Sequence, residues 1–492
     1  MILKKYKWLL LLTGVLFIAC ESDDDSITTP DEEPFVASAG SADYSKFVSV
    51  GNSLTAGFTD GALFIAGQEN SLPNILAQQF SLVGGGEFTQ PLMNDNLGGI
   101  LLGGNQILPN RLIFNGSIPV RLEGDATTEL TSPLSGSFNN MGVPGAKSFH
   151  LIAPGYGNIA GVQTGQANPY FVRFASDANA TVLGDAVTQQ PTFFSLWIGN
   201  NDVLAYATSG GAGVNQEGNL DPSTYGGNDI TDPNVFAQVY TNLVAALTAN
   251  GAKGIVANIP DVTTIPYFKT VPFNPVPLDE ATAGGVNQAY AQYNGGLLQA
   301  EAAQLITSAE REARTINFSA GQNSVVIEDE YLTDLSALGL PSLRQTTAED
   351  LIVLPASSFI GTVVNNNPQL INGVTVPLGD QWVLVPEEQE DVKNATLTFN
   401  QTIEAIALQN GLAFVDTFTI LNEVSTGAEF DEFVLNSNLV TGGAFSLDGV
   451  HPTARGYAYL ANKFIEALDE AYETKLPKVK ASDYNPFYSP SL

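Results

Sequence analysis

The segment that most constrains the fold is FVSVGNSLTAG, at residues 47–57. An apolar, β-branched run ends abruptly in Gly51-Asn52-Ser53, and small residues that suit a helix start follow it. This pattern predicts a strand, a sharp turn and a helix. A serine at such a turn lies at the end of a sheet, close to the free backbone N–H groups of the helix start. Taken alone, a Gly-x-Ser segment of this kind is more often an ordinary turn than a nucleophile site.

Further apolar runs that end in polar turns recur along the chain. Residues 192–198, 254–259 and 412–415 are nearly continuous apolar runs, which are typical of strands covered on both faces. Helical patterns occur at residues 71–80, 232–250, 286–316, 395–409 and 455–472. Alternation of strands with helices predicts an α/β fold with a mostly parallel, doubly wound sheet.

Three stretches do not fit this alternation. Residues 81–135 are rich in glycine and weakly patterned, which predicts a long insertion. Residues 320–393 carry short apolar runs between turn signals, and we expect a β-rich inserted lobe or lid there. Residues 477–492 form a Pro- and Tyr-containing tail that we expect to be loose.

The N-terminus has the pattern of an export signal. Three lysines precede an apolar run over residues 8–19, which is too short to span a bilayer but suits a signal peptide. The residues FIAC at 17–20 resemble a bacterial lipoprotein cleavage box. We therefore predict a signal peptide over residues 1–19 and a lipid anchor on Cys20. An ordinary signal peptide followed by an incidental cysteine is the alternative.

Residues 20–43 are acidic and rich in Ser, Thr and Pro, a composition that cannot bury apolar surface and predicts a flexible tether. The cluster ESDDD directly after Cys20 resembles the surface-export signal of lipoproteins from the Bacteroidetes group. A solvated run of charge is the simpler interpretation. The expected location is the outer membrane, with exposure at the cell surface as a further expectation.

The overall composition narrows the classes of partner. The formal net charge of −32 argues against nucleic acid, whose phosphates require a basic face. One cysteine and two histidines argue against a metal site built from soft ligands. We therefore expect neither a metal nor another cofactor.

Four residues that could take part in catalysis follow predicted strands: Ser53, Gly145, Asn201 and His451. In an open α/β sheet, that edge is where ligands bind. Ser53 could attack a carbonyl while His451 takes its proton, and Asp448, three residues before His451, could orient the imidazole. The backbone N–H groups of Ser53 and Gly145, with the Asn201 side-chain amide, could hold the oxyanion. These residues supply every part of serine acyl transfer.

Three other residues carry alternative interpretations. Asp416 also follows a predicted strand and could replace Asp448 as the acid. His150, the other histidine, is interpreted as a structural or rim residue. Asp202 is interpreted as a turn or supporting residue.

Four sequence blocks together resemble the SGNH (GDSL-like) hydrolase family. They are GNSL at 51–54, NMGVPG at 140–145, GNND at 199–202 and DGVH at 448–451, in the order of the family. Asn52 stands where the family usually has Asp.

The resemblance implies a flavodoxin-like three-layer α/β/α sandwich and ester hydrolysis without a metal. It assigns Ser53 as nucleophile, Gly145 and Asn201 as oxyanion partners, and Asp448 and His451 as the rest of a triad. A length of 492 residues alone would suggest about three domains. However, the four blocks run from residue 51 to residue 451 and must meet at one site, so residues 44–476 are predicted to form one domain with insertions.

The substrate class is less constrained than the chemistry. The apolar residues of the predicted insertions suggest an acyl-chain pocket or lid, which favours a lipid or acyl ester. A carbohydrate O-deacetylase is the enzymatic alternative, but aromatic platforms for sugars would be expected, and Trp197 and Trp382 are the only tryptophans after residue 19. A non-catalytic lipoprotein that binds or delivers lipid, with an outer-membrane channel or transporter as partner, is the alternative from another class.

Overall fold

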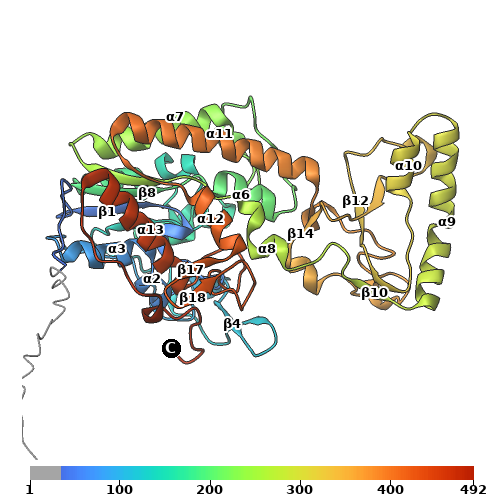
Figure 1. Ribbon diagram of the computed structural model, residues 1–492, viewed down its shortest axis with the longest axis horizontal. Helices are drawn as coiled ribbons and strands as arrows, with labels where there is room; N and C mark the ends of the chain where they lie inside the picture. Colours follow the sequence, from blue (N-terminus) through green and yellow to red (C-terminus); the bar gives the residue numbers. More distant parts are fainter. Residues whose placement is uncertain (1–34) are drawn as a thin grey trace, which may run out of the picture. The chain divides into compact units, whose positions relative to one another are not determined.

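The computed structural model describes residues 35–492. The predicted signal peptide, Cys20 and most of the predicted tether lie outside the described residues. Residues 37–492 form one unit by their contacts, and their centre is a five-stranded, fully parallel sheet (Figure 1). Its order is β7 (Asn140–Gly142), β1 (Phe47–Gly51), β8 (Phe193–Trp197), β9 (Lys253–Ala257) and β16 (Ala413–Val415).

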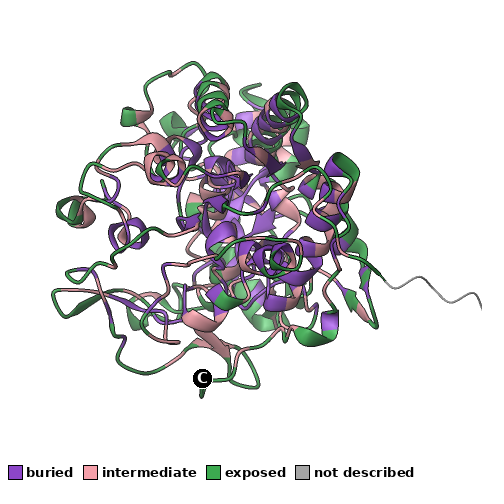
Figure 2. Ribbon diagram, turned by 90° about the vertical axis from the view of Figure 1, so that its left-hand side faces the viewer, coloured by how far each residue is buried: buried purple, intermediate pink, exposed green. Residues whose placement is uncertain are grey.

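Helices cover both faces of this sheet, so the prediction of an α/β sandwich is confirmed. On one face α3 packs against α13, and on the other α7 and α11 pack together with α5 and α6 nearby (Figure 1). Every residue of β1 and β8 is buried, as expected for strands between two helical layers. Figure 2 shows buried residues gathered in the interior of the molecule. These helices are α3 (Leu72–Ser81), α5 (Val182–Thr188), α6 (Asn201–Thr208), α7 (Pro233–Thr248), α11 (Pro386–Asn410) and α13 (Ala454–Tyr472).

The short helix α1 (Ser53–Ala56) begins directly after β1 and crosses the end of β7. Gly142 permits this close approach, because a Cβ atom at that position would overlap the backbone nitrogen of Ala56. Since all five strands are parallel, their carboxyl ends share one edge of the sheet. The predicted site residues therefore start from neighbouring strand ends.

The insertion at residues 81–135 contains two small β-structures. A three-stranded sheet has the order β3-β2-β6, and a separate hairpin pairs β4 with β5. A second apolar cluster, including Leu63, Met93, Ile100 and Leu130, packs beneath them. The strands are β2 (Ile100–Leu102), β3 (Asn105–Leu108), β4 (Leu112–Phe114), β5 (Pro119–Arg121) and β6 (Thr128–Glu129).

The second inserted lobe is longer than the predicted 320–393 and begins before it. Between β9 and α11 the chain forms three short antiparallel strand pairs and three α-helices, α8 (Pro266–Lys269), α9 and α10. The single helix predicted over 286–316 is wrong, because Gln304 adopts a left-handed φ of 60° and a new helix is capped by Thr307. The elements are β10 (Val276–Leu278), α9 (Glu280–Ala302), α10 (Ser308–Arg314), β11 (Gly321–Asn323), β12 (Val326–Glu328), β13 (Leu343–Gln345), β14 (Leu351–Ile352) and β15 (Val383–Leu384).

The C-terminal tail is packed rather than loose. The Asn462 side chain exchanges two hydrogen bonds with the backbone of Val479, and the Arg111 guanidinium donates to the Ser489 carbonyl oxygen at 2.6 Å. The Tyr488 ring also meets Phe64 edge to face. Within residues 35–492, no helix combines the length and the apolarity needed to cross a bilayer.

Candidate active site

Ser53 occupies the first position of α1, where the backbone N–H of a helix has no intrahelical acceptor. Asn52 caps this helix, and its Oδ1 accepts a hydrogen bond from the Leu54 N–H at 3.0 Å. Gly57 ends the helix in the left-handed conformation, with φ of 82°. The predicted strand, turn and helix around Ser53 are all present, and they hold the hydroxyl at the sheet edge.

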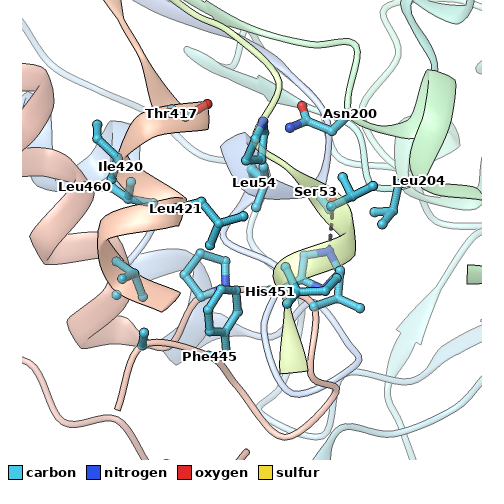
Figure 3. Close-up of a pocket in the computed structure, with 18 of the residues that line it drawn as sticks. Ser53, Leu54, Asn200, Leu204, Thr417, Ile420, Leu421, Phe445, His451 and Leu460 are labelled. Atoms are coloured by element: carbon cyan, nitrogen blue, oxygen red, sulfur yellow. Dashed lines mark hydrogen bonds between the residues drawn. The ribbon is translucent and has the colours of Figure 1, made fainter. Parts of the chain in front are cut away.

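His451 joins Ser53 and Asp448, although Ser53 is far away in the sequence. Its Nε2 lies 2.9 Å from Ser53 Oγ (Figure 3). Its Nδ1 lies 2.9 Å from Asp448 Oδ2. The structure thus brings together the three residues that the sequence assigned to proton transfer and attack.

The Asp448 carboxylate is surrounded by hydrogen-bond donors. Its Oδ1 accepts from the N–H groups of Val450 and His451 and from Ser446 Oγ, at 2.8 to 3.0 Å. Its Oδ2 accepts from the Gly61 N–H at 2.9 Å, in addition to facing His451 Nδ1. Burial alone would raise the pKa of Asp448, but His451 and these donors outweigh it and lower the pKa to about 2. The carboxylate is therefore ionised at neutral pH and can stabilise a charged imidazole.

Sequence reasoning missed the turn that supports this carboxylate. Asp60 Oδ1 accepts from the Leu447 N–H at 3.1 Å, while the neighbouring Gly61 donates to Asp448. Asp60 adopts a left-handed φ of 52°, and burial raises its pKa to about 7. The Asp-Gly pair in the sequence indicates a turn, but nothing local in it reveals a partner almost four hundred residues later.

The predicted oxyanion donors lie at three neighbouring turns. Gly145 is exposed with φ of 81°, and among residues 35–492 its N–H donates to no backbone or side-chain acceptor. Asn201 Nδ2 donates one hydrogen to the Ala146 carbonyl oxygen at 2.9 Å, which leaves its second hydrogen for a ligand. Ser53 and Asn201 line the same cavity. Gly145 does not line it, but the next residue, Ala146, accepts the hydrogen bond from Asn201.

Each of the three alternative residues has a structural partner in the fold. Asp416 caps a helix, and its carboxylate accepts from Asn258 Nδ2 at 2.7 Å and from Thr419 Oγ1 at 2.6 Å. It is therefore not the acid that faces His451. Asp202 is completely buried and accepts from the N–H and the hydroxyl of Ser148, so it supports the loop after β7.

His150 is a structural histidine. Its Nδ1 accepts from the Lys147 N–H at 3.0 Å, and its ring stacks on Tyr156. Burial, with the nearby Lys147 ammonium, lowers the pKa of His150 to about 4, so the ring is neutral at pH 7.

An apolar cavity of about 90 Å³ opens beside Ser53 and His451 (Figure 3). Most of its lining comes from α12 (Thr417–Thr426), from α13 and from the segment 435–452, and the rest comes from the end of β8, from the turns after β1, β8 and β9 and from α6. This corrects the expectation that residues 81–135 and 320–393 would form an acyl pocket, because neither segment contributes to the lining. Its apolar side chains include Leu54, Leu204, Ile420, Leu421, Phe445 and Leu460.

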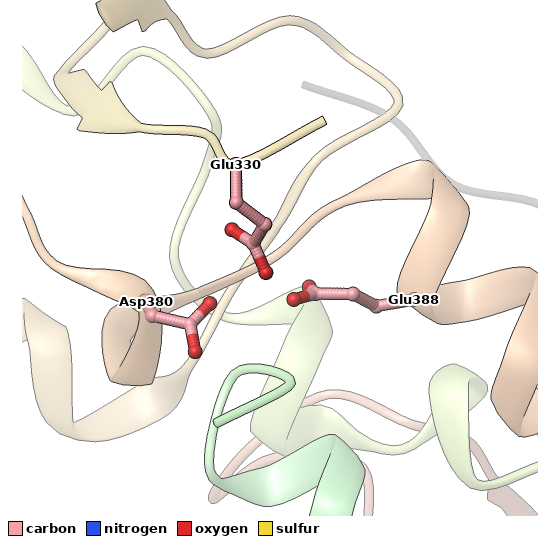
Figure 4. A group of neighbouring side chains, drawn as sticks. All are labelled: Glu330, Asp380 and Glu388. Carbon is pink, nitrogen blue, oxygen red and sulfur yellow. The ribbon is translucent and has the colours of Figure 1, made fainter. Parts of the chain in front are cut away.

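A separate group of three acidic side chains, Glu330, Asp380 and Glu388, lies at the base of the inserted lobe (Figure 4). One oxygen of each lies within 4.8 Å of the others, a spacing that could hold a divalent cation. Burial, reinforced by mutual repulsion, raises the pKa of Glu388 and that of Asp380, so the group can instead share protons. No second feature among the described residues points to a cation, and we assign none.

Comparison with known proteins adds little to this geometry. No family model and no curated protein match the chain. Among solved structures, two catalytic variants of Axe2, an acetylxylan esterase from Geobacillus stearothermophilus, are each 10% identical, with 87% of this chain and 95% of that chain covered and a TM-score of 0.31. A likeness at that TM-score carries no argument about substrate or activity, which must come from the site itself.

Proposed function

We propose that the protein is a serine-dependent hydrolase of carboxylic esters. The observation that carries this proposal is the continuous hydrogen-bonded chain from Ser53 Oγ through His451 to Asp448, with both contacts at 2.9 Å. This is the geometry that an activated serine nucleophile requires.

The proposed reaction uses each group at a stated atom. His451 Nε2 accepts the Ser53 proton as Oγ attacks the ester carbonyl carbon, and the ionised Asp448 stabilises the imidazolium through Nδ1–H. The backbone N–H groups of Ser53 and Gly145 and the Asn201 amide stabilise the oxyanion of the tetrahedral intermediate. His451 then protonates the leaving alcohol, and a water molecule releases the acid from Ser53 by the same steps in reverse order.

The proposed substrate is an ester with a medium-length acyl chain, such as a lipid. Support comes from the apolar cavity that begins at the nucleophile. The cavity is lined mostly by apolar side chains, so it suits an acyl chain better than a sugar.

We further propose that the enzyme is anchored through Cys20 to the outer membrane, as its sequence predicts. Mass analysis of the mature N-terminal peptide tests this directly, with Cys20→Ser as the control. An unmodified peptide, or an unchanged membrane fraction for Cys20→Ser, would contradict the anchor. A channel or transporter partner stays a prediction from the sequence.

A fluorophosphonate probe tests the nucleophile. The wild-type protein should be labelled at Ser53, labelling of Ser53→Ala should be lost, and Ser482→Ala, a change at an exposed serine, should label normally. Folded wild-type protein that resists the probe would contradict the enzymatic function and favour the lipid-binding alternative.

Hydrolysis of p-nitrophenyl esters with two to sixteen acyl carbons tests the substrate class. We expect kcat/KM to be higher for medium-length or long acyl chains than for the acetyl ester, because the apolar cavity beside Ser53 can bury the chain. Activity restricted to acetyl esters would contradict the acyl-chain proposal and favour a carbohydrate deacetylase.

A further inference from the structure

One wall of the apolar cavity carries a polar group without a partner. Asn200 is only 3% exposed and lines the cavity, and its Nδ2 has no hydrogen-bond acceptor among the described residues. Figure 3 shows Asn200 at the same end of the cavity as Ser53. Buried amide donors are almost always paired in folded proteins, so an unpaired one on a residue in the wall of a cavity requires an explanation.

The orientation of the Asn200 amide follows from its neighbours. The Leu54 N–H donates to Asn52 Oδ1 at 3.0 Å, which turns Asn52 Nδ2 toward Asn200. Asn52 Nδ2 in turn donates to Asn200 Oδ1 at 3.0 Å. Because Asn52 presents a donor, Asn200 must present its oxygen there, and its own Nδ2 is the atom that remains free.

We propose that Asn200 is a catalytic residue whose Nδ2 donates a hydrogen bond to an oxygen of the substrate's ester group, and that Asn52 keeps this donor free. The proposal rests on the proposed esterase function. An acyl chain in an apolar cavity offers no acceptor, so the two ester oxygens are the acceptors that such a substrate brings. The ester group must lie at Ser53, which is the end of the cavity where Asn200 lies.

This donor would act mainly on the transition state. The carbonyl oxygen gains negative charge as Ser53 attacks, so a hydrogen bond from Asn200 strengthens at that moment. Its loss should therefore lower kcat more than it changes KM. Loss of one such donor typically lowers kcat by about 100- to 1000-fold, and we take this as the largest loss of kcat expected when the Asn200 donor is removed.

The variant Asn52→Asp tests the proposal without altering Asn200. Aspartate can still accept from the Leu54 N–H and cap α1, but it offers Asn200 an acceptor in place of a donor. Asn200 should then turn its Nδ2 away from the substrate and toward residue 52. We expect kcat for p-nitrophenyl octanoate to fall by about 10- to 100-fold, with KM within about threefold. The melting temperature should also fall, because the carboxylate replaces a completely buried amide, and circular dichroism checks that the variant is folded.

Asn200→Ala and the double variant separate this effect from the added charge of the aspartate. Asn200→Ala should also lower kcat by at least about 10-fold, and Asn52→Asp should have little further effect in that background. A charge effect on His451 would instead lower kcat by the same factor in both backgrounds and would overturn the proposal.

Two further outcomes are decisive. Retention of kcat within threefold by either single variant would overturn the role of Asn200 and leave the esterase function standing. If Asn200→Ala does not fold, Asn52→Asp alone decides. Absence of both ester hydrolysis and fluorophosphonate labelling in the wild-type protein would overturn the proposed function, and this inference with it.

Discussion

The variant Asp448→Asn gives the sharpest test of the proton-transfer geometry. Three donors face Oδ1 of Asp448, so the oxygen of an asparagine would keep that position. Its NH₂ group would then face both the Gly61 N–H and His451 Nδ1, which contact the carboxylate oxygen Oδ2 in the wild-type protein. The imidazole could accept that bond only in the tautomer that carries its proton on Nε2, and this tautomer cannot take a proton from Ser53.

The size of the effect follows from these contacts. A wrong tautomer typically lowers kcat by about 10⁴-fold, and we expect a loss of about 10³- to 10⁴-fold here. The Gly61 N–H would also lose its acceptor, at a cost of about 1–3 kcal/mol in the free energy of unfolding. Steady-state hydrolysis of p-nitrophenyl octanoate and urea unfolding measure the two quantities separately.

Asp416→Asn is the matched control, because Asp416 is the other aspartate that the sequence offered as the acid. Its carboxylate caps a helix and does not face His451. We expect Asp416→Asn to keep kcat within about threefold and to lose at most about 1 kcal/mol of stability. Normal activity in folded Asp448→Asn, or a large loss in Asp416→Asn, would refute the assignment.

Two other substitutions test the cavity and the acidic group. Ala444→Phe should fill much of the cavity and lower the ratio of kcat/KM for octanoyl over butyryl esters by about 10-fold, with a folding cost of about 1–3 kcal/mol; an unchanged ratio would show that the acyl chain lies elsewhere. The folded-state pKa of Glu388 is raised, so the folded protein holds a proton that the unfolded chain releases, and stability should fall as the pH rises above about 5. Glu388→Gln should therefore be more stable than the wild type by about 1 kcal/mol at pH 8.5 and equal to it near pH 5 in urea unfolding; equal stability at both pH values would contradict the raised pKa.

The strand ends and their motifs could be predicted because their signals are local. A β-branched run that stops at Gly-Asn-Ser defines both the strand and the turn, so β1, α1 and the place of Ser53 follow from adjacent residues. Parallel strands then require the polar turns to share one edge. The contact of His451 with Ser53 could be predicted only by considering four such turns together, because no single turn implies it.

The missed elements depend on contacts that local patterns do not contain. The helix α11 begins at Pro386, before the predicted 395, because Pro386 occupies its first turn and Glu388 accepts from the Val385 N–H. The charged first turns of this helix show little amphipathic pattern, so the apolar periodicity concealed its start. The helix α12, which forms a wall of the cavity, was not predicted at all, although Asp416 at its N-cap offered a signal.

The insertion at residues 81–135 has a different role from the one its apolar content suggested. Its hairpin β4–β5 contacts the turn that holds Asp448: the Leu112 N–H donates to the Asp60 carbonyl oxygen at 2.7 Å, and Arg121 Nη1 donates to the Gly61 carbonyl oxygen at 3.2 Å. The Asp60 N–H donates to Ser446 Oγ, and the Gly61 N–H donates to Asp448 Oδ2. Asp60 Oδ1 accepts from the Leu447 N–H. The orientation of the acid is therefore fixed from outside its own loop, and a change in the hairpin should disturb the imidazole without touching substrate. The insertion therefore supports the proton-transfer geometry, because it acts on Asp448 through the backbone of Asp60 and Gly61 and contributes no side chain to the cavity.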